Sequence, residues 1–160
     1  MRKINKKFLF LVALTVSVVA LAQNPHFLKA SASLSSDGDL TVSFKEAGLG
    51  NNLLITYVAS ASATAEYACI NKGGNHPQAA NKETVTEPVS ATGTFSSGKN
   101  GTVSQSLTLE PPGPGDFTCP SGQNLVFVSV SYSNVQIADT TNGVTQSIPG
   151  TFSRTFLTLP

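Results

Sequence analysis

The sequence predicts an all-β protein, folded as an antiparallel β-sandwich of seven to nine short strands with one disulfide. Apolar and polar residues alternate with a period of two along most of the chain, and clusters of Gly, Pro, Asn and Asp separate these runs. No segment after the first 22 residues has a helical pattern. The alternation leaves one polar face per strand, as in sheets that are wetted on the outside. A closed barrel is the main alternative.

The first 22 residues are organised as a secretory signal peptide. Residues 1–7 are cationic, residues 8–19 are mostly apolar, and residues 20–22 (Ala-Leu-Ala) form a small-x-small cleavage site. No stop-transfer pattern and no lipid-accepting cysteine follow. We therefore expect residues 1–22 to be removed and residues 23–160 to form a single secreted, extracellular domain that does not insert into a membrane.

The charge of the mature chain excludes two classes of partner. The leader contains four of the ten basic residues and no acid, so the mature chain has six bases, nine acids and a formal net charge of −3. A mildly acidic domain without a basic cluster lacks the electrostatic footprint of a nucleic-acid-binding protein. For the same reason we expect no binding to anionic membranes, which leaves an unknown protein or glycan as partner.

The first half of the mature chain predicts three strands. Residues 27–45 predict a hairpin, because two alternating runs flank an Asp-Gly turn. Residues 53–70 predict one long strand with a bend or bulge among the small residues 59–63. Residues 71–82 form a polar loop that contains the breakers Gly-Gly and His-Pro.

The next segment predicts a hairpin. Residues 84–95 alternate like a strand, and Pro88 places that strand at a sheet edge or divides it in two. Residues 97–101 (Ser-Gly-Lys-Asn-Gly) are typical of a type I′ turn, from which residues 103–109 return as the second strand. Residues 110–115 are too rich in Pro and Gly for regular structure and predict a loop.

The last third begins with the most apolar run, residues 125–132, which we expect at the centre of a sheet. Its valines and Tyr132 share one face, and the alternation places Phe127 on the other. Val135 and Ile137 continue this strand or begin a neighbour. Residues 140–143 then predict a turn, and residues 151–159 a closing strand.

Two cysteines, Cys69 and Cys119, lie in the mature part. In an oxidising compartment they most simply form one disulfide, and the closed loop of roughly 50 residues would stabilise the fold by about 4 kcal/mol. Two separate buried thiols are the alternative. A zinc site is excluded because no histidines lie near the pair to complete the shell.

Tyr67-Ala68-Cys69 resembles the Tyr-x-Cys motif of immunoglobulin domains. The chain has no tryptophan, and Cys119 follows this motif where the immunoglobulin partner cysteine precedes it. The resemblance therefore implies an immunoglobulin-like architecture without the core of that family.

A broader resemblance covers most of the mature chain. Its motifs are residues 24–27 (Asn-Pro-His-Phe), 46–50 (Glu-Ala-Gly-Leu-Gly), 69–75 (Cys-Ile-Asn-Lys-Gly-Gly-Asn) and 119–120 (Cys-Pro). By these motifs the chain is similar to a set of small exported bacterial proteins. The similarity implies a shared fold and transfers no activity.

No catalytic or metal-binding set is recognisable in the sequence. The two histidines, His26 and His76, stand in loop-like contexts, and no Gly-x-Ser-x-Gly elbow occurs. The nine acids are scattered, and Asp37-Gly38-Asp39 lacks the further acids of a calcium loop. We therefore expect no enzyme activity, no cofactor and no metal.

The polar loop is the best candidate for a ligand-binding surface, because Cys69 fixes its start. Its candidate residues are Asn71, Lys72, Asn75 and His76. The sequence thus favours a non-catalytic secreted surface, matrix or interaction protein of unknown partner. One alternative is a module that binds a glycan or cell-wall polymer through loop 71–82. Another is a secreted inhibitor or effector.

Overall fold

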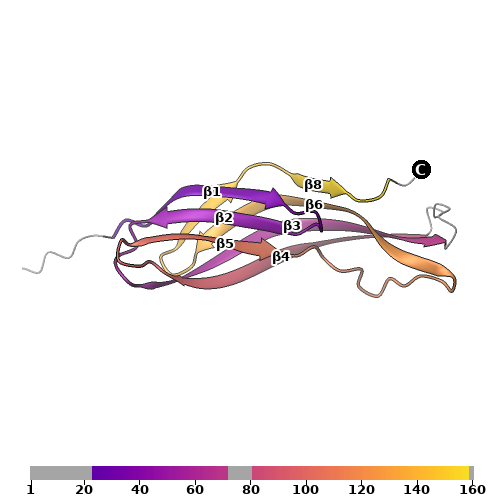
Figure 1. Cartoon of the computed structure of the whole chain (residues 1–160), viewed down its shortest axis with the longest axis horizontal. Coiled ribbons are helices and arrows are strands. Elements are labelled where there is room, and N and C mark those ends of the chain that lie inside the picture. The colour runs from indigo at the N-terminus through magenta and orange to yellow at the C-terminus, as the bar shows by residue number, and fades with distance from the viewer. Residues whose placement is uncertain (1–22, 72–80, 159–160) are drawn as a thin grey trace, which may run out of the picture.

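The computed structural model describes residues 23–71 and 81–158 (Figure 1). The predicted signal peptide, residues 1–22, lies outside these ranges, as do residues 72–80 and 159–160. The described chain folds into eight strands: β1 (His26–Leu34), β2 (Leu40–Ala47), β3 (Leu54–Asn71), β4 (Lys82–Ser96), β5 (Thr102–Leu109), β6 (Gln123–Asp139), β7 (Val144–Ile148) and β8 (Phe152–Thr155). Over these ranges no helix is long and apolar enough to span a membrane.

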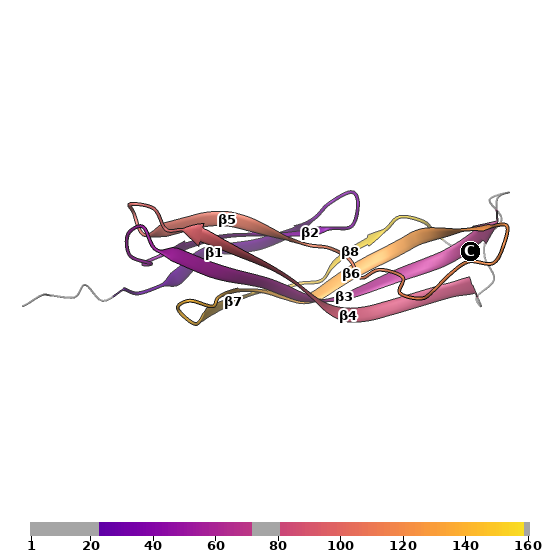
Figure 2. The same ribbon diagram turned by 90° about the horizontal axis from the view of Figure 1, so that it is seen from below.

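The strands form two antiparallel sheets, which confirms the predicted fold class. The smaller sheet has the order β1-β2-β5, and the larger has the order β4-β3-β6-β7 with β8 also paired to β6. The strands of the smaller sheet are 8 or 9 residues long, whereas β3, β4 and β6 are 15 to 18 residues long. The smaller sheet therefore covers only one part of the larger sheet, and the molecule is elongated (Figures 1 and 2).

The core lies between the two sheets where they overlap. Every second residue of β2 from Leu40 to Phe44 is buried, and the facing positions of β3 carry Tyr57 and a run of buried alanines. The rings of Phe44 and Tyr57 pack with centroids 4.5 Å apart. Period-two alternation thus places one face of each strand in the core, as the sequence predicts.

Two irregularities interrupt the pairing of β3 with β6. The register shifts between Ser60 and Ser62, opposite the bulge predicted at residues 59–63, but the extra residue lies in β6, where Asn134 has a positive φ, and β3 itself keeps its alternation. The register shifts again between Glu66 and Tyr67, and this second bulge makes the predicted face of Phe127 wrong. One extra residue reverses the alternation, so Phe127 stacks on the inner side with Tyr67 at 5.2 Å and Phe156 at 4.7 Å.

The hairpin predicted around residues 97–101 is also wrong. β4 pairs with β3 in the larger sheet and β5 pairs with β2 in the smaller one, so the chain crosses between sheets here. Asn100 lacks the positive φ that a type I′ turn requires, since Asn52 and Asn134 are the non-glycine residues with positive φ in the described ranges. The Asn-Gly signal predicts a turn, but which strands the turn joins is decided by pairing partners elsewhere in the chain.

A second crossing loop, residues 48–53, holds this turn in place. The buried Ser97 side chain accepts a hydrogen bond from the Leu53 N–H at 2.9 Å and donates one to the Gly50 carbonyl at 2.7 Å. Gly101 has φ +61°, and a Cβ there would lie 3.0 Å from the Gly50 carbonyl oxygen. The two sheet-crossing loops are therefore held together by close backbone packing at Gly101 and by the hydrogen bonds of the Ser97 side chain.

Most other predicted elements agree with the structure, although the closing strand predicted at residues 151–159 is shorter, Phe152–Thr155, and most of the predicted loop 71–82 lies outside the described residues. Residues 27–45 form the β1–β2 hairpin, and Pro88 lies on β4, at an edge of the larger sheet. β6 is central and continues through Val135 and Ile137 to the turn at residues 140–143. Residues 110–115 form no strand or helix.

Candidate functional site

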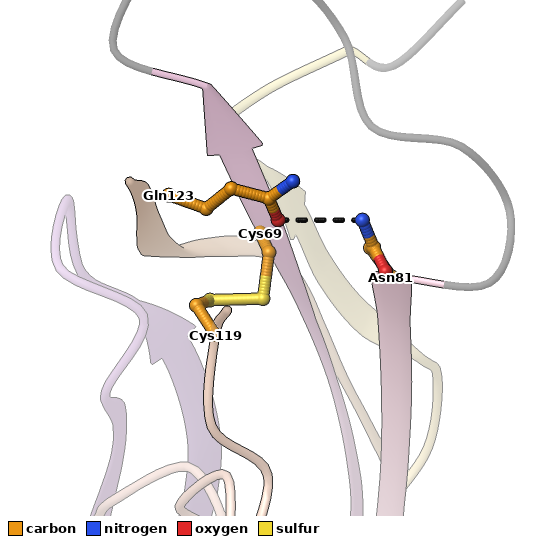
Figure 3. The surroundings of a disulfide bond; sticks show 4 residues. All are labelled: Cys69, Asn81, Cys119 and Gln123. Atoms are coloured by element: carbon orange, nitrogen blue, oxygen red, sulfur yellow. Dashed lines mark hydrogen bonds between the residues drawn. A yellow bond between two sulfur atoms is a disulfide. The ribbon is translucent and has the colours of Figure 1, made fainter. Parts of the chain in front are cut away.

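The predicted disulfide forms between Cys69 and Cys119 and lies at the end of the larger sheet (Figure 3). Beside it, Asn81, the residue before β4, donates a hydrogen bond from Nδ2 to Gln123 Oε1 at 3.3 Å. Asn71, the last residue of β3, is exposed and pairs with Gln123. The other predicted ligand residues, Lys72, Asn75 and His76, lie outside the described residues, so the proposed binding loop stays a prediction.

The disulfide ties the segment between β5 and β6 to the part of the larger sheet that extends beyond the smaller one. The Tyr67 hydroxyl donates a hydrogen bond to the Pro112 carbonyl at 2.8 Å in this segment. Burial raises the pKa of Tyr67. The tyrosine therefore anchors a chain segment 45 positions away, unlike an immunoglobulin corner tyrosine, which bonds a few residues upstream.

A buried polar cluster, which the sequence interpretation missed, lies in the overlap of the two sheets. It consists of Glu46 of β2, Tyr57 of β3 and Asp139 of β6, each at most 1% exposed. Asp139 pairs with Tyr57 across β3 and β6, and Glu46 approaches both from the opposite sheet. The acids are scattered in sequence, but Glu46 follows Leu40, Val42 and Phe44 at the inward positions of β2, and this parity signals its burial.

The members of this cluster differ in their hydrogen bonding. Asp139 Oδ1 accepts hydrogen bonds from the N–H groups of Thr141 and Asn142, and its Oδ2 accepts one from Asn142 Nδ2 at 2.6 Å. In contrast, both carboxylate oxygens of Glu46 and the hydroxyl of Tyr57 lack a hydrogen-bond partner of good geometry. Buried polar groups without partners are rare and costly, so the burial of Glu46 lowers the stability of the core when its carboxyl group is ionised.

Burial is the main cause of the unusual titration of this cluster. It raises the pKa of Glu46 to about 6 from an ordinary 4.5. The nearby Tyr57 hydroxyl partly opposes this rise, the charge of Asp139 adds to it, and His26 slightly opposes it. Burial, and secondarily Glu46, raises the pKa of Tyr57. Because the three side chains are closed to solvent, they cannot contact a substrate in the folded protein.

The outer face of the larger sheet is covered with hydroxyl groups. This hydroxyl face consists of the outward positions Thr56, Ser60, Ser62 and Thr64 of β3, Thr84, Thr86, Ser90, Thr92 and Thr94 of β4, and Ser129, Ser131 and Ser133 of β6. Cross-strand hydrogen bonds of 2.9 Å join Thr56 to Thr94 and Thr64 to Thr86. These bonds fix four side chains on neighbouring strands, so part of the hydroxyl face is pre-ordered.

The remaining candidates do not assemble into a reactive centre within residues 23–71 and 81–158. His26 is exposed, and its Nδ1 lies 2.8 Å from the carbonyl of Asn24. No group of three or more His, Cys, Asp or Glu residues in those ranges is arranged to hold a metal ion. No protein-family model, curated protein or solved structure matches the chain.

Proposed function

We propose that the protein is an exported, non-catalytic interaction protein of the cell surface or extracellular matrix. The observation that carries this proposal is the hydroxyl face, a polar and nearly uncharged surface on the outside of three long strands. A surface of neutral hydroxyls offers donors and acceptors to a polar partner. Its outward positions also include Glu66, which accepts a hydrogen bond from Ser129 at 3.3 Å, but no histidine or cysteine that would complete a nucleophilic set.

The compartment of the proposed function agrees with the disulfide. A disulfide-bonded all-β domain is compatible with an extracellular location. The signal-peptide pattern of residues 1–22 adds to this, as does the proposed kinship with small exported bacterial proteins. We infer a role outside the cytosol, in which the covalent link keeps the extended end of the larger sheet folded.

Binding to insoluble surface material tests the proposal. The protein of residues 23–160 is expected to be retained on bacterial wall or matrix polymers. Thr64→Glu with Thr92→Glu is expected to reduce retention, because two carboxylates then interrupt the hydroxyl face. The same change at Ser36, an exposed residue of the β1–β2 turn, is the control and should bind normally.

Two outcomes would refute the proposed function. One is that neither wall nor matrix material retains the folded protein. The other is turnover of an ester, peptide or glycoside panel that follows the protein through purification. Inhibition of secreted hydrolases would instead favour the inhibitor or effector alternative.

Ligand binding through loop 71–82 remains the second candidate. The Cys69–Cys119 disulfide and the Asn81–Gln123 hydrogen bond fix the chain on either side of residues 72–80. Substitution of Asn71 should weaken binding if this candidate is correct, whereas the substitutions in the hydroxyl face should then have no effect.

A further inference from the structure

The outer face of the smaller sheet differs in charge from the hydroxyl face. Three cross-strand rows make it up: Lys29–Lys45–Ser104, Ser31–Ser43–Ser106 and Ser33–Thr41–Thr108. These nine outward positions hold two lysines, seven hydroxyl residues and no carboxylate. Glu46, which follows Lys45 in the sequence, points into the core. The face therefore carries uncompensated positive charge.

The two lysines are direct cross-strand neighbours. Lys29 of β1 is paired with Lys45 of β2, and both side chains are exposed. Like charges directly opposite one another destabilise a sheet. They are also two of the five Lys and Arg residues in the described ranges. Basic residues are therefore few, and yet two of them lie side by side, where their charges repel. A ligand of opposite charge would turn this repulsion into attraction.

The lysine pair lies on a hollow that has room for such a ligand. The hollow has a volume of about 430 Å³ and is lined by the two lysines, Ser31, Ser43, Ser104 and Ser106, with Phe44 and Gln105. Lysine ammonium groups supply charge, and serine hydroxyls supply both donors and acceptors. This combination fits an anionic group carried on a hydroxyl-bearing chain.

We propose that this lysine hollow binds an anionic polymer, in which carboxylate or phosphate groups lie between the two lysines and neighbouring hydroxyls contact the serines. This inference builds on the proposed function by naming a partner class, but it uses the opposite face of the sandwich. Carboxylates and phosphates share the relevant chemistry. Comparing binding to a polyuronate, which carries carboxylates, with binding to a polyphosphate shows which of the two anionic groups the hollow prefers.

The experiment measures retention of the disulfide-bonded protein on immobilised polyuronate, on immobilised polyphosphate and on neutral dextran. Lys29→Gln with Lys45→Gln is expected to weaken anionic binding by about ten-fold at low salt, and added salt should weaken wild-type binding because it screens the charges. Lys82→Gln with Lys99→Gln removes the same charge outside the hollow. This control should stay within about two-fold of wild type.

Circular dichroism and the unfolding midpoint show whether each variant is folded. Loss of the lysine repulsion should leave the Lys29/Lys45 variant at least as stable as wild type. The proposal is overturned if neither anionic polymer retains the protein more strongly than dextran, or if the hollow and control variants bind equally. In either case retention on wall material through the hydroxyl face would leave the proposed function standing.

Discussion

Glu46 of β2 and Tyr57 of β3 meet between the two sheets, where the carboxylate and the hydroxyl are both buried and both lack a hydrogen-bond partner. Asp139 approaches the same point but is fully bonded by the β6–β7 turn. This arrangement makes one carboxyl group of the core costly when it is ionised. It also makes the stability of the fold depend on pH in a predictable direction.

We predict that the protein is more stable at mildly acidic than at neutral pH. The folded state binds the Glu46 proton more tightly than the unfolded chain, because burial raises the pKa of Glu46 from 4.5 to about 6. The stabilising contribution is thus complete below pH 4.5 and is lost as the pH rises through 6. The difference corresponds to about 2 kcal/mol.

Urea unfolding of wild type and Glu46→Gln at pH 4.5 and pH 7.5 measures this contribution. The variant should be the more stable protein at the higher pH and close to wild type at the lower one. Glu83→Gln, a change at an exposed position of β4, is the control and should shift neither midpoint. A difference between wild type and Glu46→Gln that is the same at both pH values would show that burial does not tune this carboxyl group.

Tyr57 and Tyr132 should respond differently to the loss of their hydroxyls, although both side chains are fully buried. The Tyr132 hydroxyl donates a hydrogen bond to the Gly38 carbonyl at 2.8 Å, whereas the Tyr57 hydroxyl lies near Glu46 without a hydrogen bond of good geometry. Tyr132→Phe removes a bond and leaves a buried carbonyl unpaired, which costs about 1–3 kcal/mol. Tyr57→Phe should cost less than Tyr132→Phe, because it removes only the weak interaction of the hydroxyl with Glu46.

Denaturant unfolding of the two phenylalanine variants at one pH provides the comparison. The matched substitution removes the same atom from the same residue type, so loss of packing volume cannot explain a difference. Equal destabilisation of both variants would contradict the assigned hydrogen bonds.

Removal of the disulfide should destabilise the extended end of the larger sheet more than the overlap of the two sheets. Cys69 and Cys119 are 50 positions apart, and a loop of that length predicts a loss of about 4 kcal/mol in Cys69→Ala with Cys119→Ala. Amide hydrogen exchange should become faster at Tyr67 and Phe127 than at Phe44. Uniformly faster exchange along the chain would mean that the link stabilises the whole sandwich equally.

Ser97→Ala should cost about 2–3 kcal/mol, an unusually large loss for a serine. The substitution removes two hydrogen bonds and leaves the Leu53 N–H and the Gly50 carbonyl without their side-chain partner. Ser90→Ala, at an exposed position of β4, is the control and should fall within about 0.5 kcal/mol of wild type. Thermal melts of the two variants measure the difference, and similar melts would show that the two crossing loops hold together without Ser97.

The local pattern of the sequence was sufficient to predict the strands, the polar outer faces, the edge position of Pro88 and the Cys69–Cys119 disulfide. Alternation with a period of two is a property of neighbouring residues, so each strand reveals its own buried face. The same alternation also indicates that Glu46 is buried. This is easily missed when the acids are considered only as residues scattered along the sequence.

Only the tertiary structure decided which strands pair and in what register. The turn at residues 97–101 reads as a hairpin but joins two sheets, and an extra residue in β6 turns Phe127 to the inner face. The juxtapositions of Glu46 with Tyr57 and of Lys29 with Lys45 likewise depend on contacts between different strands. Such contacts are set by pairing partners and bulges far apart in the chain, which the alternation within one strand does not encode.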